Sequence, residues 1–553
     1  MSKRISRASF LRGLIFGTAG VAAAGGGTKL YLDSLASAAD NVPCRLLGPS
    51  MSAGHMIRNR VFANVAQPKV SSRSRVVIVG GGIAGLSAAW WLKKHGVNDF
   101  VLLELEKQVG GNSTSGRNKI SAYPWAAHYV PIANPESEYV RTLFAELGII
   151  EGFDEHNEPL YNELHLCHDP QERLLKCGVF NEGLVPRKGL QAEDRTQIDR
   201  FFKLISRLRK EKGSDGKPVF AIPLDLSSAD EKFRALDKIS MSEWMQKEGF
   251  TSRPLVWYVN YCCKDDYGSL ANNVSAWAGL HYFAGRRGTA ANADMNALVT
   301  WPEGNGYLVN ALRERLKDHL QPESPVHKIK STADGIVLSY VNGAQEQKAI
   351  AAEYVIFAAP RFISKYVIVD QAKALDANDL SDLAYAPWLV ANISLTNVPE
   401  GNGLDTAWDN VSYASDSLGY VVATHQNITT RRGATVITYY QPLSDMDPVT
   451  ARKELLAAQP DKWRARILAD LEKMHPGISR DVTAIDLWPW GHGMIRPSVG
   501  YIWGDTRQRM KERQGNIFFA HSDMSGISNF EEAQYQGVQA ARGILNAMGR
   551  AET

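Results

Sequence analysis

The amino-acid sequence predicts an α/β protein of two domains, in which a domain built on a parallel sheet carries a large inserted α+β domain. Three observations lead to this class. The chain has 553 residues, which is longer than a chain that a single hydrophobic core usually supports. A β-branched run at residues 75–79 leads into a glycine-rich turn and a helical pattern, the order of a βαβ unit. Short apolar runs suited to buried strands return at residues 353–360 and 516–520, so distant parts of the chain should share one sheet.

Composition and charge are those of an ordinary globular protein. Apolar residues make up 44% and charged residues 22% of the chain, which excludes a disordered chain and a membrane bundle. The formal net charge is +3, and residues 1–38 hold five basic residues against one acidic residue. Without that segment the charge is −1 (+3 minus +4), so we expect no nucleic-acid partner.

The five cysteines lack the spacing of a zinc site or of a disulfide framework, so we predict no metal site. Cys262 and Cys263 are adjacent. They are either buried free thiols or partners in a strained vicinal disulfide.

Residues 1–38 have the anatomy of an export signal. Residues 1–12 are basic, residues 13–28 are uncharged, and small residues at 36–38 offer a cleavage site. Residues 6–12 resemble the twin-arginine consensus, with Ala8 where the second arginine belongs. We expect an exported, periplasmic bacterial protein without a membrane span after processing, a membrane-anchored form being the alternative. Residues 39–72 read as an irregular lead-in.

The glycine turn is spaced for a dinucleotide phosphate. Gly80 permits a tight turn, Gly82 lets the backbone approach a pyrophosphate, and Gly85 lets the next helix pack closely on the strand. Ile83 and Ala84 lie between the last two glycines, where the free N–H groups of a helix N-terminus would face the phosphates. The turn therefore predicts a Rossmann-like site for the ADP half of a dinucleotide.

The second strand of this unit, residues 100–103, ends on an acidic residue. Glu104 stands 19 residues beyond Gly85, where a carboxylate accepts hydrogen bonds from a ribose diol. Glu106 is close enough to take that role instead, and a solvated glutamate is the structural alternative.

Gly110 and Gly111, just beyond this strand, resemble the second glycine pair of the flavin-containing amine oxidase superfamily. That resemblance implies FAD rather than NAD. The family usually continues with arginine, whereas this chain has Asn112, and Arg117 is the nearest guanidinium.

Further segments resemble the same superfamily in chain order from residue 75 to 545. Residues 301–307 look like its Pro-x-Gly-Gly segment, with Asn305 in place of the second glycine. By resemblance Val326 contacts adenine, Asp523 holds the ribityl or diphosphate part of FAD, and Phe530 begins a final helix facing the flavin pyrimidine. The resemblance implies an FAD-binding domain from residues 73–130, 301–360 and 504–553, and a substrate domain from residues 131–300 and 361–503.

The segment at residues 483–503 resembles the part of the family chain that crosses the flavin face. Its aromatic candidates for flanking an amine, each with a core role as the alternative, are Trp488, Trp490, Tyr501 and Trp503. It contains no cysteine, so FAD should be non-covalent. The family commonly has a lysine that assists the reaction with dioxygen, and its counterpart in this chain is Asn392 or Ala391. Without that lysine, the electron acceptor could be dioxygen, a quinone or a redox protein.

Four histidines lie in or near these segments and could tune protonation, or they could be structural: His128, His281, His492 and His521. By resemblance, His128 occupies the position where the family chain passes the flavin ring. Together with Trp490 and Tyr501 from the segment at residues 483–503, it is a catalytic candidate. The leading hypothesis is an enzyme that oxidises a small amine by hydride transfer to flavin N5. The alternatives are an FAD-dependent desaturase or dehydrogenase of a non-amine substrate and a flavin-bound assembly protein without turnover.

Overall fold

A computed structural model describes residues 42–62, 65–369, 383–429 and 433–550. The predicted export signal lies outside these residues. Within them, every helix is either too short or too polar to cross a membrane.

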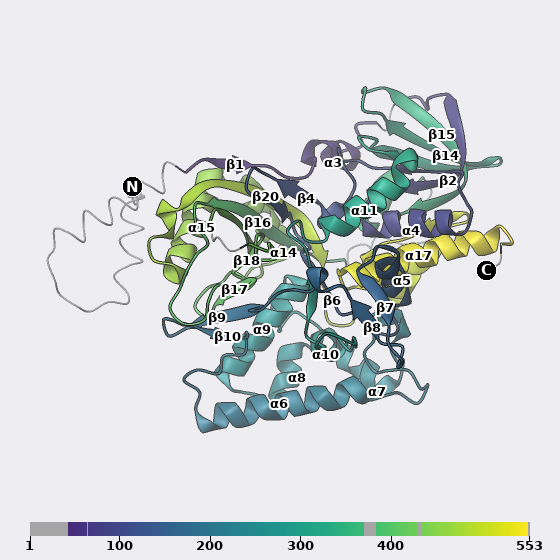
Figure 1. The fold of residues 1–553 in the computed structure, drawn as a ribbon. Helices are drawn as coiled ribbons and strands as arrows, with labels where there is room; N and C mark the ends of the chain where they lie inside the picture. The colour runs from purple at the N-terminus through teal and green to yellow at the C-terminus, as the bar shows by residue number, and fades with distance from the viewer. Residues whose placement is uncertain (1–41, 63–64, 370–382, 430–432, 551–553) are drawn as a thin grey trace, which may run out of the picture.

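The first domain is built on a seven-stranded, mostly parallel sheet (Figure 1). In spatial order its strands are β12 (Leu320–Gln321), β3 (Phe100–Leu103), β2 (Val70–Val79), β15 (Gln347–Phe357), β14 (Gly335–Val341) and β13 (Val326–Thr332), with β21 (Ile517–Phe519) also paired to β15. Strands β3, β2, β15 and β21 run parallel, which places their carboxyl ends at one edge. The expected strand at residues 100–103 is confirmed.

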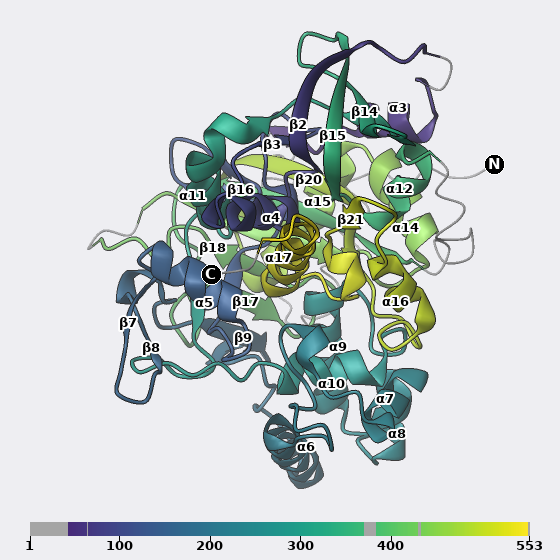
Figure 2. The same cartoon turned by 90° about the vertical axis from the view of Figure 1, so that its right-hand side faces the viewer.

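Helices cover both faces of this sheet. One face packs against α4 (Ile83–Lys94), α17 (Phe530–Ala547), α11 (Gly306–Leu316) and α5 (Glu138–Glu146). The other packs against α3 (Met51–Arg58), α12 (Arg361–Val367) and α16 (Asp505–Lys511). Figure 2 shows α4 and α17 side by side, although more than 430 residues separate them in the sequence.

The second domain is built on an eight-stranded mixed sheet. Its order is β1 (Cys44–Leu46), β20 (Val482–Ile495), β16 (Tyr385–Leu395), β19 (Thr435–Pro442), β18 (Tyr420–Val422), β17 (Asp409–Ser412), β9 (Glu172–Lys176) and β10 (Val179–Glu182). Along β16, Trp388 and Val390 face a core with α6 (Ala192–Lys210), α8 (Met241–Lys247), α9 (Arg253–Tyr267) and α10 (Ala276–Ala284). Leu389 and Ala391 face the opposite core, with α14 (Pro448–Ala457) and α15 (Pro460–Met474). This alternation is the two-residue period of a strand buried on both faces.

Smaller pairs of strands connect the two domains. They are β4 (Ser115–Arg117) with β5 (Ala122–Pro124), β6 (Tyr129–Pro131) with β11 (Leu298–Thr300), and β7 (Ile150–Phe153) with β8 (Pro159–Tyr161). The short helix α7 (Glu231–Arg234) completes the helical part of the second domain (Figure 1). The predicted two-domain α/β fold with an inserted α+β domain is confirmed.

Two expectations about segment boundaries differ from the structure. The lead-in at residues 39–72 is not irregular, because it contains β1, α3 and the first residues of β2. Strand β1 pairs with β20 of the second domain, a contact over more than 400 residues that no local pattern announces. Helix α12 was expected in the substrate domain but packs on the parallel sheet through Val367, with Ile368 bridged to Ile329 of β13.

Cys262 and Cys263 lie on α9 as buried free thiols. A vicinal disulfide, the alternative weighed from the sequence, is therefore not formed.

Candidate active site

The turn between β2 and α4 leaves no room for side chains. Gly80 has φ +105°, and a Cβ added there would lie 2.9 Å from the carbonyl oxygen of Ala358. A Cβ on Gly85 would lie 1.9 Å from the carbonyl oxygen of Gly80. Gly82 is the N-cap residue of α4, and no side chain caps this helix. The first amides of α4 are thus open to an anion at the helix N-terminus, as a pyrophosphate requires.

Glu104 lies at this turn and is buried. Its Oε2 accepts a hydrogen bond from the Gly81 N–H at 2.5 Å, and its Oε1 accepts one from the Glu106 N–H at 2.8 Å. Burial raises the pKa of the Glu104 carboxyl to about 7. Glu106 is turned elsewhere, because its carboxylate accepts hydrogen bonds from the N–H and the hydroxyl of Ser50. The geometry therefore favours Glu104 over Glu106 as the partner of a ribose.

The second glycine pair lies against the first turn. The Gly110 N–H donates to the carbonyl of Gly81 at 2.8 Å. A Cβ on Gly111 would lie 3.2 Å from the Cα of Gly82. Gly110 and Gly111 have φ values of +138° and +54°, which favour glycine. These backbones can therefore flank the same diphosphate.

The neighbouring polar residues do not replace the family's arginine. Asn112 Nδ2 donates to the carbonyl of Gly493 at 2.5 Å, and Arg117 is exposed on β4.

The cofactor candidates from the rest of the chain lie in three places. Val326 begins β13 and is buried close to Glu104, since the Ser324 N–H donates to the Glu104 carbonyl at 2.7 Å. Phe530 begins α17 and lines the large cavity that is described next. Asp523 is fully buried, and its Oδ2 accepts hydrogen bonds from Tyr385 at 2.6 Å and from the Arg361 N–H at 2.8 Å. The Asp523 carboxylate thus already has partners within the protein, and its contact with FAD stays a prediction.

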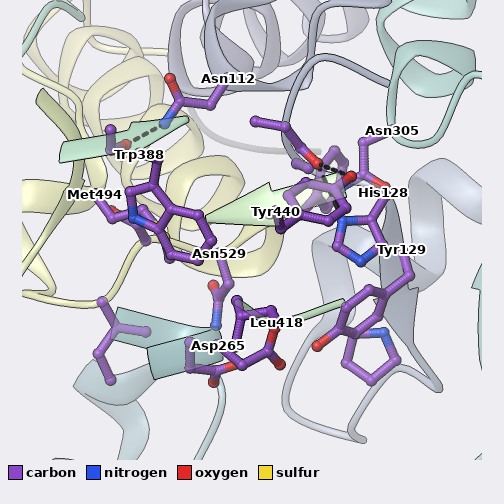
Figure 3. A pocket seen from close by; sticks show the side chains of 18 of the residues that line it. Asn112, His128, Tyr129, Asp265, Asn305, Trp388, Leu418, Tyr440, Met494 and Asn529 are labelled. Carbon is purple, nitrogen blue, oxygen red and sulfur yellow. Dashed lines mark hydrogen bonds between the residues drawn. The ribbon is translucent and has the colours of Figure 1, made fainter. Parts of the chain in front are cut away.

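A large cavity lies where the two domains meet (Figure 3). It encloses about 1200 Å³, counting the part open to solvent. One wall comes from the segments predicted to bind FAD: Asn112, Ala126, Ala127, His128, Asn305, Asn529 and Phe530. Asn305 is buried, and its Oδ1 has no hydrogen-bond partner, so a polar atom is left for a bound group.

The opposite walls of the cavity are aromatic and acidic. They come from α9, α10, β16, β17 and the segments beside them: Tyr129, Tyr261, Asp265, Asp266, Tyr282, Arg286, Trp388, Asp409 and Tyr440. Sequence reasoning missed all three aspartates and Arg286. Only the adjacent acidic pair at the end of α9 was visible in the sequence, and such a pair is usually a solvated helix end.

His128 lies on the cavity wall as a neutral ring. Its Nδ1 lies 3.0 Å from the carbonyl oxygen of Ala126, and its ring stacks on Tyr440 with centroids 4.6 Å apart. Burial lowers the pKa of His128 to about 4. The imidazole is therefore uncharged near neutral pH. This charge state suits a role of His128 in an aromatic wall better than a role as an acid catalyst.

The other catalytic candidates lie at different depths. Trp490 lines the cavity, and its indole N–H donates to the carbonyl of Trp125 at 2.8 Å. Tyr501 is buried outside the cavity lining, and its hydroxyl donates to the carbonyl of Asp523 at 2.8 Å. The structure thus brings His128 and Trp490 together but not Tyr501.

The remaining histidines are held by structural contacts. His281 Nε2 lies 2.8 Å from the carbonyl oxygen of Ala221, His492 stacks on Phe362 at 4.5 Å, and His521 Nδ1 lies 3.0 Å from Asp523 Oδ1. Only His281 among these lines the cavity.

The position expected for a lysine holds a buried amide. Asn392 Nδ2 donates to the carbonyl of Pro124 at 3.0 Å, and its Oδ1 accepts from the hydroxyl of Thr438 at 2.7 Å. Neither Asn392 nor Ala391 reaches the cavity, which β16 lines with Trp388 and Val390. In the described part of the chain, no group of three or more His, Cys, Asp or Glu side chains is arranged to hold a metal ion.

Comparison with known proteins identifies the family. The family model described as flavin containing amine oxidoreductase matches residues 83–545. The chain is 25% identical over 296 residues to the oxidoreductase PigB of Serratia sp. (strain ATCC 39006), which covers 49% of this chain and 41% of that protein. It is 25% identical over 297 residues to the L-amino-acid oxidase of Bungarus fasciatus, covering 53% and 52%. The chain thus spans about half the length of these curated relatives.

Solved structures share the fold. A structure of putrescine oxidase bound to putrescine aligns with a TM-score of 0.64 and 15% identity, covering 86% of this chain and 99% of that one. Cyclohexylamine oxidase from Brevibacterium oxydans IH-35A aligns with a TM-score of 0.60 and 14% identity, covering 86% and 100%. At these identities the likeness shows the fold alone.

The residues present fit FAD. The uncapped N-terminus of α4 and the glycine pairs accommodate a diphosphate, Glu104 lies where a ribose would be bound, and Asn305 Oδ1 remains unpartnered on the cavity wall. Among the described residues that line the cavity, there is no cysteine that could attach the flavin. The chain therefore belongs to the flavin containing amine oxidoreductase family, and its cofactor is FAD.

Proposed function

We propose that this enzyme oxidises a small amine at the carbon next to nitrogen. The observation that carries the proposal is the position of the cavity, whose walls come from the start of α17 and residues 126–128 on one side and from the substrate domain on the other. When bound, FAD supplies the chemistry by accepting a hydride equivalent. The protein's own residues orient the amine and exclude water from it.

The side chains around the expected reaction site are suited to an uncharged amine. His128, Tyr440 and Trp388 present ring surfaces, and His128 is neutral because burial lowers its pKa to about 4. An amine must have a free lone pair to assist hydride loss, so neutral walls near this site favour the reaction. A side-chain base is not required when the amine enters as the free base.

The lining residues argue against two alternatives. Asp265 and Asp409 on the wall disfavour a wholly apolar desaturase substrate, because an apolar molecule would leave these carboxyl groups desolvated and without a basic partner. A flavin-bound assembly protein without turnover does not require a cavity of about 1200 Å³ with a mixed aromatic and acidic lining.

An L-amino acid is a second candidate substrate. Arg286 lies on the cavity wall, and a guanidinium can bind an amino-acid carboxylate in a bidentate manner. L-amino-acid oxidases are also among the relatives. Arg286 already pairs with Asp266 at 3.0 Å, which makes this candidate weaker than an amine without a carboxylate.

Anaerobic mixing tests the proposal. We expect the yellow holoprotein to lose flavin absorbance on mixing with at least one member of a panel of primary amines, diamines and L-amino acids. Bleaching by L-amino acids alone would shift the assignment to the second candidate. Loss of no absorbance with any member would overturn amine oxidation, and a colourless protein that releases no FAD on heating would support the assembly protein.

The same experiment addresses the electron acceptor. No lysine lines the cavity, and the expected lysine position is occupied by the buried Asn392. We therefore propose a quinone or a redox protein as acceptor. Reduced enzyme should recover its colour faster with a soluble quinone than with dioxygen, and rapid recovery with dioxygen alone would identify an oxidase.

A further inference from the structure

The far part of the cavity contains more acidic than basic side chains. Asp265 and Asp266 lie in the last turn of α9, and Asp409 begins β17. All three line the cavity, and each is partly accessible from it. Arg286 is the single Lys or Arg among the lining residues. Glu531 of α17 is buried and also lines the cavity, so four carboxyl groups meet one guanidinium, an excess of three acids over bases.

Arg286 is already neutralised by its neighbours. Its Nη2 donates to Asp266 Oδ1 at 3.0 Å and to the hydroxyl of Tyr129 at 2.9 Å. Its guanidinium also lies over the ring of Tyr282, 4.6 Å from the centroid. In the described ranges, neither Asp265 nor Asp409 forms an ion pair with a basic side chain. Apart from Glu531 at the start of α17, the excess acids are thus Asp265 and Asp409.

The protein alone stabilises these two groups poorly as carboxylates. Burial and the neighbouring Asp266 raise the pKa of Asp265 to about 7. Burial, together with Asp265 and Glu172, raises the pKa of Asp409 well above its ordinary value. Buried like charges disfavour each other, and a cation placed between them removes both penalties.

The surrounding side chains suit an alkylammonium ion. Tyr261 on α9 and Tyr282 on α10 also line the cavity and offer ring faces to a cation and its methylene chain. Figure 3 shows Asp265 on the opposite side of the view from Asn112, which marks the end near the second glycine pair. Asp265 therefore lies away from the end of the cavity near the second glycine pair.

These acids are unsuited to the amine that reacts. A carboxylate beside the reacting nitrogen would raise the amine's pKa and hold it protonated, without the lone pair that hydride loss requires. The neutral walls at His128 and Tyr440 meet that requirement better. An ammonium bound by the acids is therefore a spectator group.

We propose that the substrate is a diamine or polyamine whose second, non-reacting ammonium is bound by Asp265 and Asp409. This inference rests on the proposed function and specifies its substrate class. It excludes a substrate whose carboxylate would lie beside these acids.

Three compounds of similar length separate the possibilities. Cadaverine carries two amines, n-pentylamine lacks the second amine, and L-lysine adds a carboxylate to the cadaverine skeleton. Anaerobic stopped-flow mixing with the holoprotein gives the apparent Kd and the rate of flavin reduction for each. We expect cadaverine to show an apparent Kd at least about ten-fold below that of n-pentylamine, and L-lysine to bind more weakly than cadaverine. Diamines of other chain lengths then locate the optimum spacing.

Conservative variants identify the residues. Asp265→Asn and Asp409→Asn should abolish most of the preference for cadaverine over n-pentylamine, measured as the ratio of the two apparent Kd values. Asp416→Asn removes an exposed carboxylate of the same domain and should change neither value. Retained FAD absorbance and a single cooperative thermal unfolding transition show that each variant is folded.

The failures are distinguishable. Bleaching by n-pentylamine and cadaverine with equal apparent Kd would overturn the second-ammonium site and leave amine oxidation standing. A preference for cadaverine that survives in both aspartate variants would also overturn it. Bleaching by no amine would instead refute the proposed function itself.

Discussion

Glu104 is the residue that we predict to bind the ribose of FAD. Its two carboxylate oxygens accept backbone hydrogen bonds from Gly81 and Glu106, so the side chain is fixed at the mouth of the turn. Burial raises its pKa to about 7, and hydrogen bonds donated by a ribose diol would favour its ionised form. We predict that Glu104→Gln raises the Kd for FAD by about ten-fold or more, measured by fluorescence titration of the apoprotein.

Glu106→Gln is the matched control. The Glu106 carboxylate is occupied by the N–H and hydroxyl of Ser50, at 2.8 and 2.7 Å. This variant should loosen the start of α3 without changing the affinity for FAD. Should the two variants behave the other way round, the ribose role belongs to Glu106.

At the scale of the elements, α4 and α17 can approach closely because glycines lie between them. A Cβ on Gly537 would lie 2.1 Å from the carbonyl oxygen of Ala84, in the first turn of α4. Gly537→Ala must push α17 away and move Phe530 at its start. We predict a loss of about 1–3 kcal/mol in the free energy of unfolding and weaker FAD retention, measured by denaturant titration and flavin release.

Gly54→Ala provides the comparison. Gly54 lies in α3, and a Cβ there would have no neighbour within 4 Å. Alanine should leave the stability unchanged or raise it by up to about 1 kcal/mol. Equal unfolding curves for Gly537→Ala and wild type would show that the close approach is not needed.

The elements also show why some features could be predicted from the sequence and others could not. Strand β3 and helix α4 have strong local patterns, so residues 100–103 and the glycine turn were located correctly, whereas the start of α17 at Phe530 was located by resemblance to the family. Strand β1 has only three residues and forms by pairing with β20, a partner outside any local window. Asp265 and Asp409 line the same cavity only because α9 and β17 lie together in the fold. No spacing along the chain indicates this arrangement.

At the scale of the whole molecule, polar contacts join the two domains beside the cavity. Glu532 of α17 accepts a hydrogen bond from the Leu224 N–H at 2.6 Å. Asp225 pairs with Arg507 of α16 at 3.0 Å and also with Lys511. The substrate domain is thus fixed to the same helices that position the flavin end of the site, so the cavity depends on both domains together.

The buried acids make the stability of the whole molecule depend on pH. Burial raises the pKa values of Asp265, Glu531 and Glu532 to about 7. The folded protein then holds protons that the unfolded chain, with carboxyl pKa values of about 4, has already released. This contribution to stability is fully present below the unfolded pKa and is lost as the pH rises through about 7.

Buried histidines act in the opposite direction at lower pH. Burial lowers the pKa values of His128, His281 and His475 to about 4, against about 6.5 in the unfolded chain. Their contribution is present above about pH 6.5 and is lost as the pH falls toward about 4. Between about pH 4 and pH 6.5, the contributions of the buried acids and the buried histidines to stability change in opposite directions and offset each other. Above about pH 6.5 the acids determine how stability changes with pH.

We therefore predict that the holoprotein melts at a lower temperature at about pH 8 than at about pH 6.5, followed by differential scanning calorimetry. Asp265→Asn removes one of the responsible carboxyl groups and should make this decrease smaller. A bound diamine should have the same effect, because an ammonium beside Asp265 stabilises the ionised form that high pH produces. Its stabilisation of the wild type should accordingly be larger at about pH 8 than at about pH 6.5, and this difference should be smaller in Asp265→Asn, where only Asp409 remains beside the ammonium. A melting temperature that instead rises between these pH values would mean that these carboxyl groups ionise as exposed ones do.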